Sequence, residues 1–256
     1  TYSLSLREKL VVALEEIFVN SKEEKDAIVL IKELVDLGSE YFYFRILPKA
    51  KKTFVNAEQL LKKYNRTANI SDDFSVELVR IYLYLGDIGN EEEDFSVSDK
   101  YYNLALLESE KLLSRTKSSK YLFYLAASHQ CLGTLYEKLG NYNRAFDLYY
   151  TAHEILINVN EESPSTEYKD NLAGSYRNLA MIKKKLREYD EAFRYYEKAL
   201  DISKQLADEL DTVQSKIRLA VAYFYLAALH DVVGHTSDAK KFFEMCHEIN
   251  VYCHEK

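Results

Sequence analysis

The chain has 256 residues, of which 47% are hydrophobic, enough for a sizeable core and too many for a disordered chain. Its formal net charge of −7 argues against a nucleic-acid partner bound through general attraction to phosphates, and no apolar run approaches the roughly 18 residues that span a bilayer, which argues against a membrane partner. Only 7 Gly and 2 Pro occur, so long helices are favoured over strands joined by tight turns.

The first predicted element is a helix over residues 4–19. It is expected to be amphipathic, and its apolar positions are Leu4, Leu6, Leu10, Val11, Leu14, Ile17 and Phe18. The segment lacks the basic start, long apolar core and small-residue cleavage site of a signal peptide. Because the chain begins with Thr rather than Met, we expect it to be a piece of a longer protein.

From residue 23 onward the chain repeats itself. Small marker residues recur at intervals of 48, 47, 47 and 47, at Gly38, Gly86, Gly133, Ala180 and Ala227. Twelve residues after each marker lies a second small residue, four further an aromatic one, and three beyond that a third small one. These three series are Ala50, Ser98, Ala145, Ala192 and Ala239; Phe54, Tyr102, Tyr149, Tyr196 and Phe243; and Ala57, Ala105, Ala152, Ala199 and Cys246. Such phase agreement indicates a repeat protein.

Each repeat is predicted to be a pair of helices, because small residues let two backbones approach and the aromatic residue shares their helical face. The turns of the last three pairs are expected near Gly140, Arg187 and Gly234. Pro48 and Pro164 are expected in first helical turns, with Ser163 as an N-cap. A final helix is predicted over residues 237–254.

The stretch "CLGTLYEKLGNYNRAFDLYYTA", residues 131–152, resembles the tetratricopeptide repeat (TPR). "NLAMIKKKLREYDEAFRYYEKAL" is similar, with Ala180 and Lys183 for the usual Gly and Tyr. The resemblance covers residues 24–254 and implies an all-α, right-handed α-solenoid, or superhelix, of about five helix–turn–helix units. Residues 1–22 would be an N-terminal capping helix and residues 23–256 the solenoid. The period of 47, against ~34 in the standard repeat, is similar to that of kinesin-light-chain-like arrays and arrays attached to bacterial signalling proteins.

No constellation of catalytic residues or cofactor motif was found, so we expect neither an enzyme nor a cofactor. The "CHEINVYCH" stretch offers Cys246, His247, Cys253 and His254 as metal ligands, but seven helical residues span about 10 Å, so structural cysteines are favoured over a zinc site. "HDVVGH" is interpreted as packing between helices, and the acidic run at residues 90–95 as a solvated turn, with docking of a basic partner as the alternative. Three scattered cysteines favour a reducing cytoplasm.

The first helices of the pairs are expected to line a concave binding face. The resemblance places groove residues three before, one after and four after each marker. These are Val35, Ser39 and Phe42; Leu83, Asp87 and Asn90; Gln130, Thr134 and Glu137; Arg177, Met181 and Lys184, with Lys185 beside it; and Phe224, Ala228 and Asp231. The position just after the marker never holds the Asn of the co-chaperone type of repeat, which argues against a receptor for chaperone tails.

The hypothesis is therefore a non-catalytic scaffold or adaptor that binds a protein or peptide with an acidic centre and apolar flanks. Arg177 and Lys184, seven residues apart on one helical face, are the predicted carboxylate-binding pair. One alternative is a sensor or autoregulatory domain of a larger signalling protein, an ATPase or protease, that docks on its own effector domain. Another is a spacer whose groove side chains are simply solvated.

Overall fold

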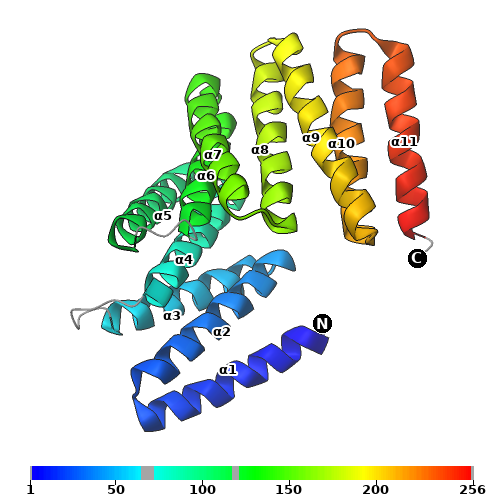
Figure 1. The fold of residues 1–256 in the computed structure, drawn as a ribbon. Helices are drawn as coiled ribbons and strands as arrows, with labels where there is room; N and C mark the ends of the chain where they lie inside the picture. The colour runs from blue at the N-terminus through cyan, green and yellow to red at the C-terminus, as the bar shows by residue number, and fades with distance from the viewer. Residues whose placement is uncertain (1, 65–71, 117–120, 255–256) are drawn as a thin grey trace. The chain divides into compact units, whose positions relative to one another are not determined.

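The computed structural model of the chain describes residues 2–64, 72–116 and 121–254, and this part contains eleven α-helices and no strand (Figure 1). The all-α prediction is confirmed. The helices are α1 (Tyr2–Ser21), α2 (Glu24–Tyr43), α3 (Leu47–Tyr64), α4 (Asp72–Glu91), α5 (Phe95–Thr116), α6 (Leu122–Lys138), α7 (Tyr142–Glu162), α8 (Thr166–Lys185), α9 (Tyr189–Leu210), α10 (Val213–Val232) and α11 (Thr236–His254).

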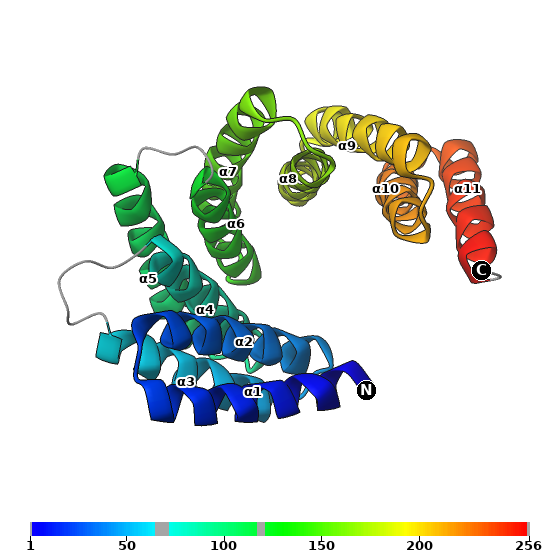
Figure 2. The ribbon, with the colours of Figure 1, turned by 60° about the horizontal axis from the view of Figure 1, so that its bottom comes forward.

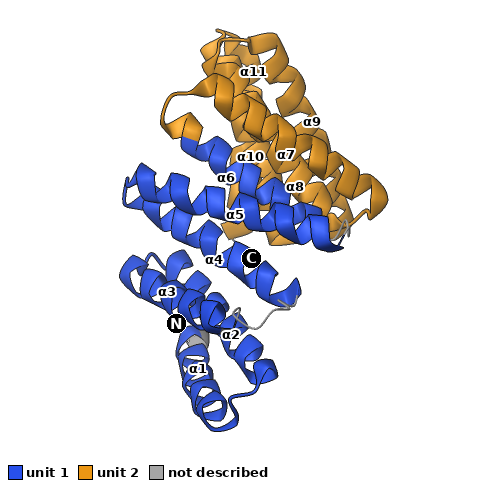
Figure 3. Ribbon diagram, turned by 90° about the vertical axis from the view of Figure 1, so that its left-hand side faces the viewer, with its two compact units in different colours: residues 1–135 blue, residues 136–256 orange. Residues whose placement is uncertain are grey.

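The helices fall into two compact units, residues 1–135 and 136–256 (Figure 3). In the first unit, α1 precedes the antiparallel pairs α2–α3 and α4–α5. In the second, α8, α9, α10 and α11 lie side by side as successive antiparallel neighbours (Figures 1 and 2). The helix pair α6–α7 lies between these pairs in the sequence, so five pairs follow α1, as predicted.

In the α2–α3 and α4–α5 pairs, the small and aromatic repeat positions form the contact between the two helices. A Cβ atom on Gly86 would come within 2.4 Å of the Tyr102 ring, and one on Gly38 within 2.7 Å of Phe54. The aromatic ring of the second helix therefore packs directly on the backbone of the first. Tyr102 and Phe54 are almost completely buried, as are the matching Tyr149 and Tyr196. Phe243 on α11 is the exception at 38% exposed.

The turn inside every pair contains one residue in the left-handed conformation. These residues are Arg45, Glu93, Gly140, Arg187 and Gly234, with φ between 58° and 82°. In the α8–α9 turn, the Arg187 N–H donates to the carbonyl of Lys184 and the Glu188 N–H to that of Lys183. This is the hydrogen-bond pattern of the Schellman motif, which satisfies carbonyls at a helix end. The predicted turns near Gly140, Arg187 and Gly234 are confirmed.

Two details of the start of α8 differ from the prediction. The N-cap of α8 is Ser165, whose side chain accepts a 3.1 Å hydrogen bond from the Tyr168 N–H. Ser163 instead ends α7, and Pro164 lies between the two helices rather than in the first turn of α8. Ser165, two residues after Ser163, caps α8 in its place. Proline is compatible both with the segment before a helix and with its first turn. Pro48 does lie in the first turn of α3.

Helix α1 packs against α2 through its inner face, where Val11 is 5% exposed and Leu14 and Phe18 are partly buried. The Tyr41 hydroxyl of α2 donates a hydrogen bond to Glu8 of α1. The helix predicted for residues 4–19 is thus two residues longer at each end; Thr1, where the predicted capping segment begins, lies outside the described residues. None of the described helices combines the length and apolar character that crossing a membrane requires.

Candidate binding surfaces

The predicted groove positions of the first pair are only partly accessible. Val35 is completely buried, and the Ser39 hydroxyl donates a 2.7 Å hydrogen bond to the carbonyl of Asp36 within α2. Phe42 is half-buried, with its ring centroid 5.8 Å from that of Tyr84 on α4. These three side chains therefore pack within unit 1, and Phe42 keeps a partly exposed edge.

In the second pair the predicted polar groove residues hydrogen-bond to the hydroxyl of a buried tyrosine. The Tyr102 hydroxyl of α5 donates to Asp87 Oδ1 at 2.6 Å and accepts from Asn90 Nδ2 at 2.9 Å. Asp87 is half-buried and Asn90 is buried. Burial, with the Asp87 charge adding to it, raises the pKa of Tyr102 well above its usual value, so the hydroxyl keeps its proton. Leu83 packs against the core of unit 1.

The third pair repeats this arrangement with different residues. The Tyr149 hydroxyl of α7 donates to Glu137 Oε2 at 3.1 Å, twelve positions earlier in the chain. Burial raises the pKa of Glu137, while the Tyr149 hydrogen bond and the charge of Lys185 oppose that shift. Earlier on α6, the half-buried Thr134 hydroxyl donates to the carbonyl of Gln130 at 3.1 Å, and Gln130 is also half-buried.

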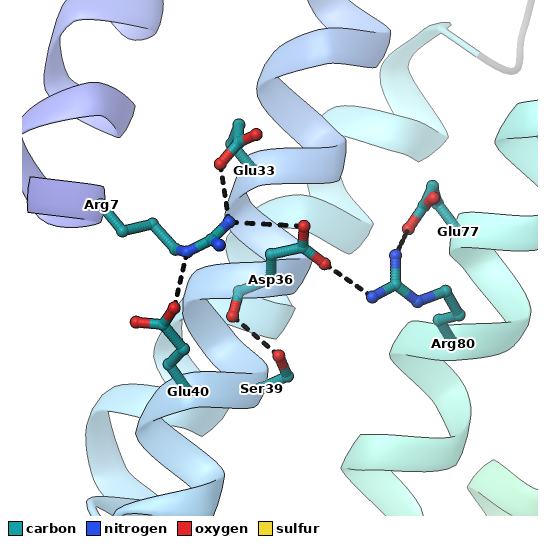
Figure 4. Close-up of polar contacts among 7 residues, drawn as sticks. All are labelled: Arg7, Glu33, Asp36, Ser39, Glu40, Glu77 and Arg80. Atoms are coloured by element: carbon teal, nitrogen blue, oxygen red, sulfur yellow. Dashed lines mark hydrogen bonds and ion pairs between the residues drawn. The ribbon is translucent and has the colours of Figure 1, made fainter. Parts of the chain in front are cut away.

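A network of ion pairs joins α1, α2 and α4 in unit 1 (Figure 4). Arg7 of α1 contacts three carboxylates of α2, Glu33 at 2.8 Å, Asp36 at 3.4 Å and Glu40 at 2.8 Å. Arg80 of α4 contacts Asp36 at 2.7 Å and Glu77 at 2.7 Å. Asp36 therefore lies between the two guanidinium groups.

The carboxylates of this network outnumber its two arginines, and one is deeply buried. The Glu77 side chain is 5% exposed, and burial raises its pKa although Arg80 opposes the shift. Each arginine already has at least two carboxylate partners, so an added anion would have to compete with the carboxylates of the network. We interpret this surface of unit 1 as internal cross-linking of three helices rather than as a carboxylate receptor.

The first-helix surface of unit 2, formed by α8 and α10, differs from this network in the partners of its basic side chains. Arg177 and Lys184 of α8 are both half-buried, and neither forms an ion pair or side-chain hydrogen bond with any described residue. The Arg177 guanidinium carbon lies 5.8 Å from the Tyr225 ring centroid of α10, within cation–π range. Burial lowers the pKa of Lys184, and the adjacent charge of Lys185 lowers it further. Lys185 itself is exposed.

A buried hydroxyl without a hydrogen-bond partner lies in the same unit. Tyr196 of α9 matches Tyr102 and Tyr149, but its hydroxyl has no partner among the described atoms. The position twelve residues earlier, which holds Asn90 or Glu137 in the preceding pairs, is Lys184 here. Burial raises the pKa of Tyr196, and the nearby Arg177 charge opposes this.

Aromatic surface lies next to these groups on α10. Phe224 is 49% exposed, and its ring lies edge-on to Tyr225 and to Phe243 of α11, each with 5.8 Å between centroids. Tyr225 in turn stacks on Tyr196 at 5.8 Å. Of the remaining predicted groove residues, Met181 and Ala228 are half-buried and Asp231 is exposed.

The four candidate ligands of the "CHEINVYCH" stretch are not brought together. Cys246 is buried, and its Sγ lies 3.5 Å from Asn250 Nδ2. Cys253 Sγ is 4.0 Å from the Val213 carbonyl of α10, while His247 and His254 are exposed. Burial raises the pKa of the Cys246 thiol, which disfavours the thiolate form that binds metal.

The acidic run at residues 90–95 stabilises the α4–α5 turn. Glu91 pairs with Arg45, and Glu92 with Lys51 at 2.6 Å. Asp94 accepts a 3.1 Å hydrogen bond from the Val97 N–H at the start of α5. Its pKa is lowered chiefly by the hydrogen bond from the Ser96 hydroxyl and secondly by the bond from the Val97 N–H. At least two of its carboxylates therefore already have a basic partner within unit 1.

Residues 171–250 match the family described as "Tetratricopeptide repeat". This segment carries tetratricopeptide repeats. The matched segment covers most of α8 to α11, where the marker positions are the alanines Ala180 and Ala227. Among curated protein sequences, none matches this TPR chain.

Solved structures similar to this TPR chain include BtubC (BKLC) from P. vanneervenii, at a TM-score of 0.74 and 16% identity over 99% of this chain and 91% of that one. A putative kinesin light chain with nearly identical TPR-like repeats, from Podosopora anserina, has a TM-score of 0.59 and 14% identity over 87% and 95%. A Rap protein complexed with competence and sporulation factor has a TM-score of 0.59 and 14% identity over 97% and 72%. These likenesses show a shared fold.

Proposed function

We propose that this TPR chain is a non-catalytic scaffold that binds a carboxylate-bearing protein segment on the first-helix surface of unit 2. The observation that carries the proposal is the state of Arg177 and Lys184, two half-buried cations without a carboxylate partner among the described residues. Desolvated cations are costly when unpaired, and an acidic ligand would supply the missing partner.

The comparison with unit 1 makes this surface distinctive. In unit 1, Arg7 and Arg80 are each held by two or more carboxylates. Arg177 forms no ion pair with a described residue: the Tyr225 ring lies beside it, and Asp170, whose pKa burial raises, is near enough for the Arg177 charge to oppose that shift. A guanidinium can stack on an aromatic ring and still bind a carboxylate through its N–H donors.

The neighbouring groups define the kind of ligand. Arg177 and Lys184 are seven residues apart, which places them about 10 Å from one another along α8. A segment with acidic residues at that spacing can engage both. Phe224 supplies an exposed aromatic contact on α10 for an apolar flank, and the Tyr196 hydroxyl is a polar group still without a partner. The expected ligand is an extended or helical segment with an acidic centre and an apolar flank.

The Rap protein of similar fold was crystallised with competence and sporulation factor, and helical-repeat arrays in general use their first-helix surfaces to bind other proteins. Both facts favour recognition over a spacer. The same Rap chain extends beyond the region covered here, since 72% of it is matched. The second version of the function is a regulatory domain that docks on an effector domain of the same polypeptide.

The test is a peptide-display selection against the purified chain and its Arg177→Glu/Lys184→Glu variant. Lys240→Glu/Lys241→Glu is the matched control, because both lysines are exposed on α11 and the charge change is the same. We expect the wild type and the control to recover acidic-centred peptides and the α8 variant to lose them. Equal recovery by all three proteins, or none by any, would refute the α8 surface as the binding site.

A further inference from the structure

The turn between α10 and α11 gathers three side chains that can ligate a metal ion. His230, His235 and Asp238 each offer one ligand atom, and these atoms all lie within 4.8 Å of one another. His230 Nδ1 lies 4.0 Å from Asp238 Oδ2. All three residues belong to unit 2, and none of them is among the residues of the proposed peptide-binding surface.

Backbone hydrogen bonds in the turn fix the positions of the His230 and His235 backbones. The His235 N–H donates a 2.9 Å hydrogen bond to the His230 carbonyl, across Gly234 at φ +82°. The His235 carbonyl in turn accepts from the Ala239 N–H at 3.0 Å, which begins α11. Asp238 lies in the first turn of that helix. Both histidines and the aspartate are thus carried by hydrogen-bonded backbone.

The His230 ring has a polar atom that no described group satisfies. Its side chain is 16% exposed, and Nδ1 is buried without a hydrogen-bond partner. Phe193 and Phe242 pack against the ring, with centroids 4.6 and 5.4 Å away. Burial lowers the pKa of His230; Asp238 and Glu197 of α9 oppose that shift and His235 adds to it.

We propose that His230, His235 and Asp238 bind a divalent transition-metal ion of the zinc type. Two imidazoles and one carboxylate are ligands that zinc accepts at bond lengths of about 2.0–2.2 Å, with water in a fourth position. Calcium and magnesium prefer all-oxygen sites. Bonds of that length require ligand atoms about 3.3 Å apart. The exposed His235 and Asp238 side chains can close the difference by rotating toward the packed His230 ring.

The ion would satisfy His230 Nδ1 and cross-link the end of α10 to the start of α11. Phe193 of α9 and Phe242 of α11 both lie against the His230 ring, so the ion would approach Nδ1 from the side of the exposed ligands, His235 and Asp238. Because ligand histidines must be neutral, binding should weaken as the pH falls through the histidine range.

The test uses the full 256-residue chain, freed of metal with a chelator, and zinc or cobalt(II) as the probe. The variants are His235→Ala and Asp238→Asn; His230 is left in place because it packs among aromatic side chains. His247→Ala and Cys253→Ser are the controls, which remove other potential ligands of α11. Calorimetry gives stoichiometry and affinity, cobalt absorption reports ligand type, and thermal unfolding reports stabilisation.

We expect one zinc ion per wild-type chain, a raised Tm, and cobalt bands without thiolate charge transfer. His235→Ala should weaken binding at least about tenfold and Asp238→Asn by a smaller factor, while both controls bind as the wild type does. The proposal is overturned by absence of wild-type binding, by unchanged affinity in His235→Ala, or by loss of binding in either control instead.

Discussion

The Tyr102 hydroxyl donates a 2.6 Å hydrogen bond to Asp87 Oδ1, across the two helices of one TPR pair. One position of the repeat therefore combines a buried ring with a satisfied hydroxyl, because Asn90 also donates to that oxygen. Two pairs later, the equivalent Tyr196 hydroxyl is buried with no partner among the described atoms.

This difference predicts opposite responses to the same substitution. Tyr102→Phe leaves a half-buried carboxylate and a buried amide without their shared partner, and should lower the free energy of unfolding by about 1–3 kcal/mol. Tyr196→Phe removes a buried hydroxyl that has no partner, so stability should stay the same or rise. Urea unfolding of both variants beside the wild type measures this. An equal loss in both would contradict it.

The glycine at the marker position should be intolerant of a methyl group. Gly86→Ala places Cβ 2.4 Å from the Tyr102 ring, so the ring or the helices must shift. We expect a loss of about 1–3 kcal/mol, typical of overpacking. Gly174→Ala on α8 is the control, since the atom nearest its Cβ is the end of Arg177, 3.8 Å away. Alanine there should stabilise the helix by about 0.5–1 kcal/mol. Thermal unfolding of the two variants decides the sign of each.

Arg80 and Lys32 both connect α2 to α4, but their removal should have unequal effects. Arg80→Met leaves Glu77, 5% exposed, without its ion-pair partner, and should cost about 1–3 kcal/mol. Lys32→Met breaks a 2.9 Å pair with Asp73 whose side chains are 41% and 58% exposed, so about 0–1 kcal/mol is expected. Denaturant unfolding at low and high salt separates the two, because salt should weaken only the Lys32 pair appreciably. Similar losses would mean that the unit 1 network is screened as well.

His153 should make unit 2 sensitive to acid. The ring is 4% exposed, and its Nδ1 lies 2.9 Å from the Ser175 Oγ of α8. Burial lowers the pKa of His153, Lys198 lowers it further, and Glu154 opposes both. A lowered folded-state pKa means that protonation favours the unfolded chain. This contribution to stability is complete above the unfolded value of about 6.5 and is lost as the pH falls below it.

The slope from this group is at most about 1.4 kcal/mol per pH unit. The free energy of unfolding of the wild type and of His153→Asn, measured from pH 7.5 to 5, checks this. The variant should lose less stability over that range, because the amide cannot take up a proton. His129 and His230, whose pKa values are also lowered by burial, remain in the variant and should leave a residual slope. Parallel curves for the two proteins would exclude the assignment to His153.

The pair architecture could be predicted because the chain repeats the residues that make the contact. Every copy has a small residue at the position of Gly86 and an aromatic residue at the position of Tyr102. Their packing depends on residue size and spacing, which a sequence displays directly. The turns of the first two pairs were harder to place. Arg45 and Glu93 take the left-handed conformation there, and neither residue type signals it.

The binding surface was less predictable. An offset from the marker predicts which helical face holds Asp87 and Glu137, but it does not show that both accept a hydrogen bond from a tyrosine of the next helix. Asp36 and Arg80 were missed because their contact joins positions 44 residues apart that no shared offset relates. That Arg177 and Lys184 lack partners is likewise visible only in three dimensions. Their role in binding remains a prediction.

The left-handed turns show what is free to change in this chain. Arginine, glutamate and glycine all occupy the same backbone conformation, although a side chain there costs about 1–2 kcal/mol. The geometry is therefore imposed by the helices on either side, which meet through their small and aromatic residues. The fold therefore tolerates several residue types at this turn position, although a side chain there carries the cost just given. A turn of this kind can accordingly exchange one charge for its opposite, or accept a reporter group, while the two helices that it joins keep their packing.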